Sequence, residues 1–495
     1  MTIALQGFPP ELAGYGHLFL LMTNLVIASI TSAHAVLWKR DARSAIIWVS
    51  LIWFIPFAGA ALYLIFGINR IQRRATRLRT ERHCLPTPPL ANSCLPHEIA
   101  RQLGNPANAT DVTDVTEIAT TIDAITDRSL LPGNRIQPLV NGNEAFPEML
   151  RTIAQARKSI TLSTYIFDQD PSGARFASAL AQAQQRGVAI RILVDSTGAL
   201  YSWPPITDRL RQLDLRFARF LPPSKLIRPL TLNLHNHRKI MVVDGRIGFT
   251  GGMNIRHANV INEMTIRPVH DIHFKLEGPV VAHLQSAFAE DWAFATNEQL
   301  TGEDWFPPLR KRGTVLARGI TDGPDEDLDK LIWTIIAALN AAKTSVSIIT
   351  PYFLPETQII AALNAAALRG VHVRILIPSK NNLPFMNWAM SAMLWQVLHR
   401  GCHVYATPPP FDHSKLMIVD QCWCLIGSAN WDARSLRLNF EFNVECYSRS
   451  LATALLREVD RKLEAAHPIT LRHINERSLP IKLRDGFTRL LSPLL

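Results

Sequence analysis

The stretches "ARKSITLSTYIF" (156–167) and "AAKTSVSIITPYF" (341–353) decide the fold, because they are two copies of one pattern. In each copy a short apolar run, typical of a buried strand, ends near a tyrosine, Tyr165 or Tyr352, and leads into an alanine-rich helical stretch. Similarity at this spacing indicates an internal duplication. The sequence therefore predicts two related domains.

Each helical stretch is followed by a second strand of the same kind. A glycine, Gly187 or Gly370, is expected to end the helix, and the strands "RGVAIRILVD" (186–195) and "RGVHVRILIP" (369–378) follow. Two strand–helix–strand units predict an α/β fold of two repeats, with mixed sheets covered by helices. A proline-rich segment around Trp305–Leu309 marks the boundary between the copies, and we expect the chemistry where the copies meet.

Both copies carry one polar motif, a histidine, a lysine two residues later and an aspartate five residues after that, followed by a Gly-rich turn and an asparagine. In the first copy, "HRKIMVVDGRIGFTGGMN", the motif consists of His237, Lys239, Asp244, Gly251, Gly252 and Asn254. In the second, "HSKLMIVDQCWCLIGSAN", it consists of His413, Lys415, Asp420, Gly427, Ser428 and Asn430. Residues two apart on a strand share a face, so each copy places an imidazole beside an ammonium.

This pairing suits attack on a phosphodiester. An imidazole with a pKa of about 6.5 can act as a neutral nucleophile or as a protonated acid, and a lysine neutralises the phosphate oxygens. Asp244 precedes a glycine at an expected tight turn, so we give it first a structural role. A single such motif arises by chance, but two in matching repeats argue against unrelated histidines and lysines. His83, His235, His257 and His372 have no comparable neighbours and are taken as structural.

With these motifs the chain resembles the phospholipase D superfamily, and within it the bacterial cardiolipin synthases. The resemblance covers nearly the whole chain apart from a linker. It is carried by "SAIIWVSLIWFIPFAGAALYLIFG" (44–67), "NHRKIMVVDG" (236–245), "SANWDARSLRLNFEFN" (428–443) and the terminal "LLSPLL" (490–495).

The resemblance implies a two-step phosphatidyl transfer. His237 would attack phosphorus to form a phosphatidyl-histidine, and His413 would protonate the leaving alcohol and then deprotonate the incoming one. The motifs alone do not distinguish the two roles. Asp271 and Glu441, 34 and 28 residues after the motif histidines, match the family's acidic positions, and each would hold the second nitrogen of a histidine. The alternative is that both are surface acids on strands.

The expected reaction joins two phosphatidylglycerols into cardiolipin and releases glycerol, with no cofactor and no metal. Phosphatidylethanolamine as donor, or water as acceptor in a phospholipase D, remains an alternative. Two positions depart from the family pattern. Gly252 stands where the second copy has Ser428, so a hydroxyl donor to the phosphate is missing there, and Val269 and His270 replace a usual Trp and Arg, which puts the lipid preference in doubt.

The excess of apolar residues lies near the N-terminus. Leu18–Leu37 and Ala45–Phe66 are each long enough to cross a bilayer as a helix, which predicts a transmembrane helical hairpin. The first stretch contains polar residues, so an interfacial or re-entrant segment is the alternative. More arginines follow the second stretch (Arg70–Arg82) than lie between the stretches, so both termini and the catalytic domains are expected in the cytoplasm, at the inner membrane of a bacterium.

The composition narrows the alternatives. A formal charge of +11 favours anionic partners, either a nucleic acid or an anionic bilayer surface. The membrane segments favour phospholipids over nucleic acid, so a nuclease of the same superfamily is the weaker hypothesis, and a non-catalytic scaffold is disfavoured by two intact motifs. The six cysteines show neither a disulfide framework nor a zinc spacing.

The expected domain organisation has five parts. They are a membrane hairpin with a basic segment (1–82), a linker with at most one short helix (83–130), two phospholipase D-like domains (131–300 and 301–465) and an amphipathic C-terminal tail (466–495). Within the tail, the segment Ile481–Leu495 places apolar residues at helical spacing, namely Leu483, Phe487, Leu490, Leu491 and Leu494. This apolar stripe would either lie on the membrane or pack against the catalytic domain.

Overall fold

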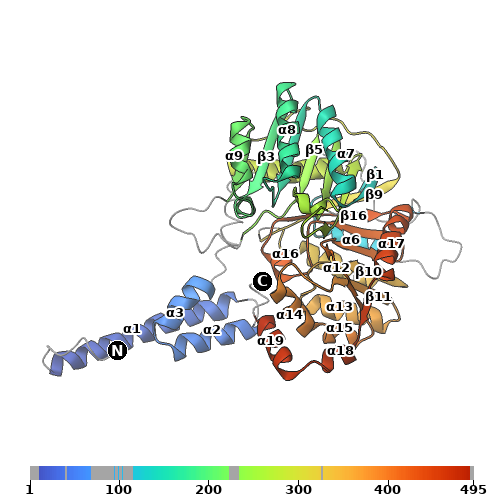
Figure 1. The fold of residues 1–495 in the computed structure, drawn as a ribbon. Coiled ribbons are helices and arrows are strands. Elements are labelled where there is room, and N and C mark those ends of the chain that lie inside the picture. Colours follow the sequence, from blue (N-terminus) through green and yellow to red (C-terminus); the bar gives the residue numbers. More distant parts are fainter. Residues whose placement is uncertain are drawn as a thin grey trace. The chain divides into compact units, whose positions relative to one another are not determined.

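The computed structural model describes residues 10–39, 42–67, 94, 99, 103, 115–221, 234–262, 264–324 and 327–490 (Figure 1). It divides into two compact units, residues 1–74 and 75–495, and each is considered by itself. The basic run Arg70–Arg82 and the last five residues lie outside the described residues.

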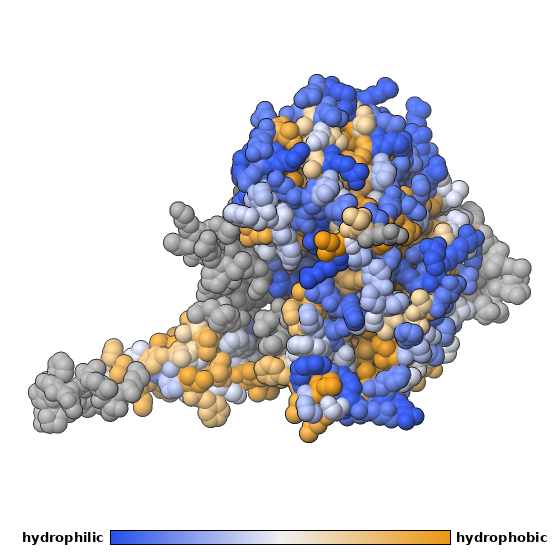
Figure 2. Space-filling view, viewed as in Figure 1, coloured by the Kyte–Doolittle hydropathy of each residue, from blue (hydrophilic) through white to orange (hydrophobic). Residues whose placement is uncertain are grey.

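The N-terminal unit is helical. It contains α1 (Pro10–Trp38), α2 (Ala42–Phe54), α3 (Ala58–Leu62) and a π-helical turn (Tyr63–Gly67), and α2 packs against α1. Within α1, Leu18–Trp38 is long and apolar enough to cross a membrane, and it is the one such helix in the described part of the chain. Figure 2 shows a largely apolar surface over this unit.

Thr31, Asn24 and His34 of α1 are hydrogen-bonded inside the unit, whereas the buried hydroxyl of Ser32 has no partner among the described residues. Thr31 donates to the carbonyl of Ile27 one turn earlier, and Asn24 accepts from the backbone N–H of Phe57 at 3.0 Å. His34 Nδ1 lies 2.7 Å from the Tyr63 hydroxyl. Such internal pairing is what an apolar environment requires of polar groups, so these residues do not argue against α1 lying in a membrane.

The second apolar stretch, expected as one helix over Ala45–Phe66, is interrupted. α2 ends at Phe54, and Phe57 has a left-handed φ of 56° before α3 begins. The physical reason is Pro56, which has no N–H to continue the helical hydrogen bonds. The expectation of one continuous helix is therefore wrong, and the two-span hairpin is not confirmed.

The larger unit is built around one continuous 15-stranded sheet in the described chain. The first copy supplies β1 (Leu131–Val140), β2 (Ser159–Thr164), β3 (Ala189–Asp195), β4 (Phe217–Phe220), β5 (Ile240–Val243), β6 (Ile247–Gly251) and β8 (Ile272–Glu277). The second supplies β9 (Val315–Asp322), β10 (Ser345–Ile349), β11 (His372–Pro378), β12 (His403–Thr407), β14 (Leu416–Val419), β15 (Trp423–Gly427) and β16 (Glu441–Tyr447).

The strand order shows the duplication. Outward from the centre the first copy runs β1-β8-β6-β5-β2-β3-β4 and the second β9-β16-β15-β14-β10-β11-β12, and the antiparallel pair β1 and β9 joins them. Pairing is parallel among β2, β3 and β4 and antiparallel around β5 and β6, so each half is mixed as expected. The phospholipase D-like α/β fold is thus confirmed.

Helices cover both halves of the sheet. The first copy contains α7 (Asn141–Gln155), α8 (Pro171–Gln185), α9 (Ile206–Gln212) and α11 (Val281–Thr296). The second contains α12 (Lys330–Ala341), α13 (Thr357–Leu368), α14 (Pro384–Met393), α15 (Trp395–Leu398), α16 (Ala433–Arg437) and α17 (Arg449–Glu464). Figure 1 shows α7, α8 and α9 on one side of the junction and α12, α13 and α14 on the other. Each copy has its own apolar core.

Two segments outside the repeats join the second copy. From the expected linker, α6 (Val115–Asp123) packs against α12, and its buried residues belong to the second core. From the expected tail, β17 (His467–Ile469) pairs with β12, so the expected boundary at residue 466 falls just before a strand of the sheet. Two short helices follow, α18 (Leu471–Asn475) and α19 (Leu479–Leu490).

α19 is amphipathic but packs with its polar side inward. Asp485 and Thr488 are buried, whereas Leu483, Phe487 and Leu490 are 64%, 66% and 70% exposed. The helix contacts α14, and Asp485 pairs with Arg477. Of the two alternatives for the apolar stripe, the described residues therefore do not show its burial against the catalytic domain.

Candidate functional site

The motif histidines lie at equivalent ends of two equivalent strands. β5 begins directly after Lys239 and β14 directly after Lys415, and all residues of both strands are buried between neighbouring strands. His237 and His413 line one cleft of about 1250 Å³ at the junction of the copies. The structure thus brings both motif histidines together where the copies meet, and the expectation that the chemistry lies there stays a prediction.

The copies exchange backbone hydrogen bonds beside the histidines. The N–H of His237 donates to the carbonyl of Phe440 at 2.9 Å, and the N–H of His413 donates to the carbonyl of His270 at 2.7 Å. A two-stranded parallel pair, β7 (Val269–His270) with β13 (Phe411–Asp412), strengthens the second crossing. His270 is one of the two residues that depart from the family pattern, and its backbone carbonyl accepts the hydrogen bond from His413.

The expected acids also cross between the copies. His237 Nδ1 lies 2.9 Å from Oε1 of Glu441, and His413 Nδ1 lies 2.8 Å from Oδ2 of Asp271. The two carboxylate side chains are 0% exposed, so the alternative of surface acids is excluded. Each histidine is held by the carboxylate of the other copy, although the sequence spacing counts each acid from the histidine of its own copy. An Nδ1–H that donates to a carboxylate leaves Nε2 with the free electron pair.

The buried site shifts the pKa values of its charged groups. Burial lowers the pKa of His237 and of His413 to about 4 each, even though Glu441 and Asp271 act in the opposite direction. Burial would raise the pKa of Glu441, but the neighbouring His237, Lys239 and Ser428 hold it below its ordinary value. These lowered pKa values favour the neutral form of both imidazoles at neutral pH, which is the form a nucleophile needs.

The motif lysines lie beside their histidines. Lys239 Nζ donates to the carbonyl of His237 at 2.7 Å. Lys415 Nζ donates to the carbonyl of His413 and also lies 2.8 Å from Nδ1 of that ring, which in turn lies 2.8 Å from Oδ2 of Asp271. Burial and the charge of the other lysine lower the pKa of Lys239 to about 7, and burial lowers the pKa of Lys415 to about 8. A bound phosphate anion would favour the charged form of both lysines.

The motif aspartates lie away from the histidines. Because a strand advances ~3.3 Å per residue, Asp244 is roughly 16 Å along the chain from Lys239. Asp244 Oδ1 accepts from the backbone N–H groups of Lys158 and Ser159 at 2.7 and 3.1 Å, and Asp420 makes the same contacts at the start of β10. Grouping these aspartates with the catalytic residues is therefore not supported by their position, whereas the structural role is.

The family described as "Cardiolipin synthase, PLD-like domain" matches residues 149–292 and 335–463, and the family described as "Phospholipase_D-nuclease N-terminal" matches residues 26–67. Cardiolipin synthase A of Pseudomonas aeruginosa is 32% identical, with 98% of both chains covered. The major cardiolipin synthase ClsA of Bacillus subtilis is 30% identical, with 96% of this chain and 99% of that protein covered.

The chain belongs to the cardiolipin synthase family. It is a phosphatidyltransferase enzyme of the phospholipase D superfamily. The fold agrees, because the crystal structure of phosphatidylserine synthase from Haemophilus influenzae superposes with a TM-score of 0.58 at 15% identity, covering 77% of this chain and all of that one. The N-terminal family match and the apolar α1 indicate a membrane-associated protein.

The first copy has Gly252 where the second copy has Ser428, and the contacts of the two residues explain this difference. The Ser428 hydroxyl donates to Oε2 of Glu441 at 2.5 Å and accepts from the N–H of Phe442. At Gly252 a Cβ would lie 2.4 Å from Oδ1 of Asp271. Ser428 thus holds an acid and the glycine leaves room for one, while the expectation that a hydroxyl donor to the phosphate is missing at Gly252 stays a prediction.

The motif asparagines line the same cleft. Asn254 Oδ1 accepts from the N–H of Ile166 at 3.1 Å and so ties the Gly-rich turn to the loop after β2. Asn430 Oδ1 is buried and has no hydrogen-bond partner among the described residues. The expected substrate-contacting role remains a prediction for both.

Sequence reasoning missed several residues of the cleft. The Tyr165 ring meets the His237 ring edge-on at 5.1 Å, and the Tyr352 ring lies 6.4 Å from that of His413. Asp432 is buried in the cleft wall, where burial raises its pKa to about 6. The signal for both tyrosines was available, since each follows a repeat strand closely. For Asp432 the available signal was a helix N-cap pattern, because its side chain accepts from the N–H of Ser435 three residues later.

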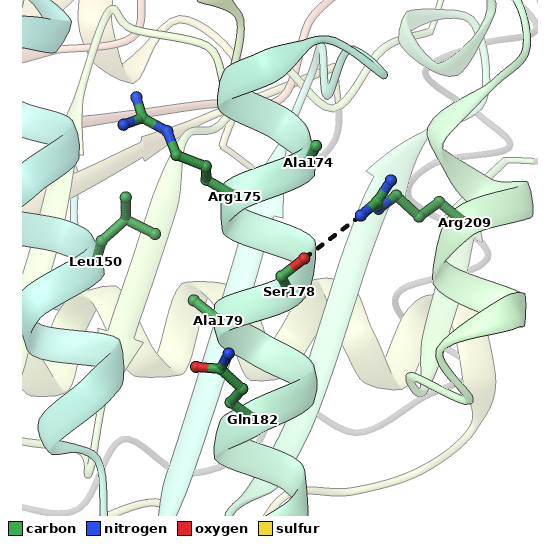
Figure 3. Close-up of a pocket in the computed structure, with 7 residues that line it drawn as sticks. All are labelled: Leu150, Ala174, Arg175, Ser178, Ala179, Gln182 and Arg209. Carbon is green, nitrogen blue, oxygen red and sulfur yellow. Dashed lines mark hydrogen bonds between the residues drawn. The ribbon is translucent and has the colours of Figure 1, made fainter.

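A second hollow, shown in Figure 3, differs in chemistry. It has a volume of about 390 Å³ between helices α7, α8 and α9, and Arg175 and Arg209 flank it. No histidine and no carboxylate lines this hollow, and Arg209 donates to Ser178 at 3.4 Å. Among the residues that the structure describes, no cluster of His, Cys, Asp or Glu is arranged to hold a metal ion.

Proposed function

We propose that the enzyme joins two phosphatidylglycerol molecules into cardiolipin and releases glycerol. The observation that carries the proposal is one cleft lined by two imidazoles, each held at Nδ1 by a buried carboxylate of the other copy. The relatives from Pseudomonas aeruginosa and Bacillus subtilis are named cardiolipin synthases, and they match along nearly the whole chain.

The first half-reaction breaks the donor lipid. Nε2 of His237 attacks the phosphorus and the bond from phosphorus to the glycerol oxygen breaks. The bound phosphate anion favours the imidazolium form of His413, which supplies the proton from Nε2 to that oxygen and returns to its neutral form. Lys239 and Lys415 neutralise the phosphate oxygens, and Glu441 stabilises the positive charge that His237 gains on bonding to phosphorus. The product is a phosphatidyl-histidine and free glycerol.

The second half-reaction reverses these roles with a new alcohol. His413 takes the proton of the acceptor hydroxyl, its oxygen attacks phosphorus, and the bond between phosphorus and His237 breaks. The geometry does not distinguish the two histidines, because each has the same kind of carboxylate contact. We therefore assign His237 as the nucleophile from the resemblance to the superfamily. Asp271 holds His413 in the orientation that both proton transfers need.

Two elements support a place at the inner membrane. Leu18–Trp38 of α1 supplies an apolar span, and the exposed stripe of α19 (Leu483, Phe487 and Leu490) suits the surface of a bilayer. We infer that the catalytic unit faces the cytoplasm, on the distribution of arginines in the sequence.

The test uses defined lipid vesicles and mass spectrometry of the products. Phosphatidylglycerol alone should yield cardiolipin and glycerol, and His237→Ala and His413→Ala should each abolish transfer with the fold retained. His372→Ala, an exposed histidine of β11, is the matched control and should keep the full rate. Phosphatidic acid as the sole product would refute the synthase and favour a phospholipase D. A strict need for phosphatidylethanolamine would instead reassign the donor.

A further inference from the structure

The cleft is charged unevenly beyond its motif residues. Its lining includes four further cations, which are Arg256, Arg267, Lys380 and Arg434, and a single carboxylate, which is Asp432. The positive charge of these side chains exceeds the negative charge of one bound phosphate, which favours the binding of a second anion in the cleft.

Lys380 lines the cleft from the loop that follows β11, and this loop is tied to residues next to His413. Asn382 Oδ1 in this loop accepts from the Tyr352 hydroxyl at 2.9 Å, and Asn381 donates to the carbonyl of Pro351 at 2.9 Å. The Tyr352 ring in turn lies 6.4 Å from the ring of His413. The loop that carries Lys380 therefore borders the His413 side of the cleft.

Arg267 reaches the same side from the other copy. It lies two residues before Val269, which pairs with Phe411, and the Phe411 ring lies 5.8 Å from the ring of His413. Arg267 and Lys380 are both exposed, and no carboxylate pairs with either of them in the part of the chain that the structure describes. By contrast, Arg256 pairs with Asp168 at 2.9 Å.

Apolar side chains accompany both cations at the cleft mouth. Ile266, next to Arg267, is 85% exposed, and Leu383 and Phe385, close to Lys380, are 38% and 36% exposed. All three line the cleft. A cation beside an exposed apolar side chain matches a lipid, whose phosphate binds the cation and whose acyl chains meet the apolar surface.

We propose that Lys380 and Arg267 form a second phosphate site, which binds the phosphodiester of the acceptor lipid. This inference rests on the proposed function. His413 removes the proton of the acceptor hydroxyl, so the acceptor must lie on the His413 side of the cleft. In phosphatidylglycerol that hydroxyl is joined through glycerol to a phosphate, and the site holds this charge while the hydroxyl oxygen attacks phosphorus. Water and simple alcohols lack this charge, so the site selects an anionic lipid as acceptor.

The test makes two acceptors compete in one reaction. Phosphatidylglycerol vesicles with added ethanol give cardiolipin from the lipid acceptor and phosphatidylethanol from ethanol, and the ratio of the two is measured by mass spectrometry. The variant is Lys380→Gln with Arg267→Gln. The control is Arg175→Gln with Arg457→Gln, which removes two exposed cations from α8 and α17, outside the cleft.

The cleft variant should lower the ratio of cardiolipin to phosphatidylethanol about tenfold, as expected for losing charge-assisted contacts to a phosphate. It should still make phosphatidylethanol at a rate close to that of the unaltered enzyme, and the control should keep the original ratio. An unchanged ratio in the cleft variant, whether or not the total rate falls, would overturn the second site, because membrane attraction or donor binding affects both products alike. Failure of the unaltered enzyme to form either product would instead refute the proposed function.

Discussion

Replacing Glu441 with glutamine tests the cross-copy support of His237 at nearly constant shape. In the structure the Glu441 side chain is 0% exposed and contacts His237 Nδ1 through both oxygens, at 2.9 and 3.1 Å. Two unit charges ~4 Å apart at an effective dielectric constant of about 20 interact by roughly 4 kcal/mol. Because His237 gains positive charge as it bonds to phosphorus, Glu441→Gln loses most of this stabilisation. We expect a fall in rate of about a hundredfold to a thousandfold.

The assay measures glycerol released from phosphatidylglycerol vesicles per folded molecule, with the folded fraction taken from circular dichroism. The matched control is Glu445→Gln, four residues along the same strand. Glu445 is equally buried but pairs with Arg318 at 2.5 Å, away from the histidines. Breaking that buried pair should cost about 3–5 kcal/mol of stability and leave the rate per folded molecule nearly unchanged. A normal rate in Glu441→Gln, or an equal loss of rate in both variants, would refute the reasoning.

Two further outcomes are expected. Asp244→Ala should lower the free energy of unfolding by about 1–3 kcal/mol, because the N–H of Ser159 and its neighbours lose their acceptor, while Asp244→Asn should lower it less; a lost rate with an unchanged melting temperature would make Asp244 catalytic. For pH, the lowered pKa values mean that Lys239 and Lys415 lose their protons above about 7 and about 8, and His237 gains one below about 4. The value of kcat/KM should therefore fall as the pH rises through 7 to 8 and again as it drops towards 4; an alkaline decline only near the pKa of an ordinary lysine would contradict the lowered values.

The two repeats and their helices were predictable because the evidence is local. Apolar strands, an alanine-rich helix and a terminating glycine lie within one stretch of each copy, and such patterns depend on neighbours in sequence. The joining of both halves into one sheet through β1 and β9 was not predictable, since that pairing connects residues far apart in the chain and leaves no local pattern. The break in the second apolar stretch had a readable signal in Pro56, which outweighs hydropathy.

The candidate site divides in the same way. His237 and Lys239 follow from a spacing of two on a strand, so their neighbourhood could be read directly. The partner of each acid could not, because Glu441 and Asp271 reach the histidines only after the copies have docked. The sequence likewise did not predict whether the apolar stripe of α19 would be buried or exposed, because an amphipathic pattern does not show which face a neighbouring helix will cover.

The exchange of carboxylates ties the two halves of the gene product together. A single domain, expressed without the other copy, would keep its motif histidine but lose the carboxylate that orients it. Its own buried carboxylate would also lose its histidine partner. Separate expression of the halves should thus give inert proteins unless they reassociate. The two copies can diverge in sequence at most positions. At His237, Glu441, His413 and Asp271, however, a change in one copy removes the partner of a residue in the other copy.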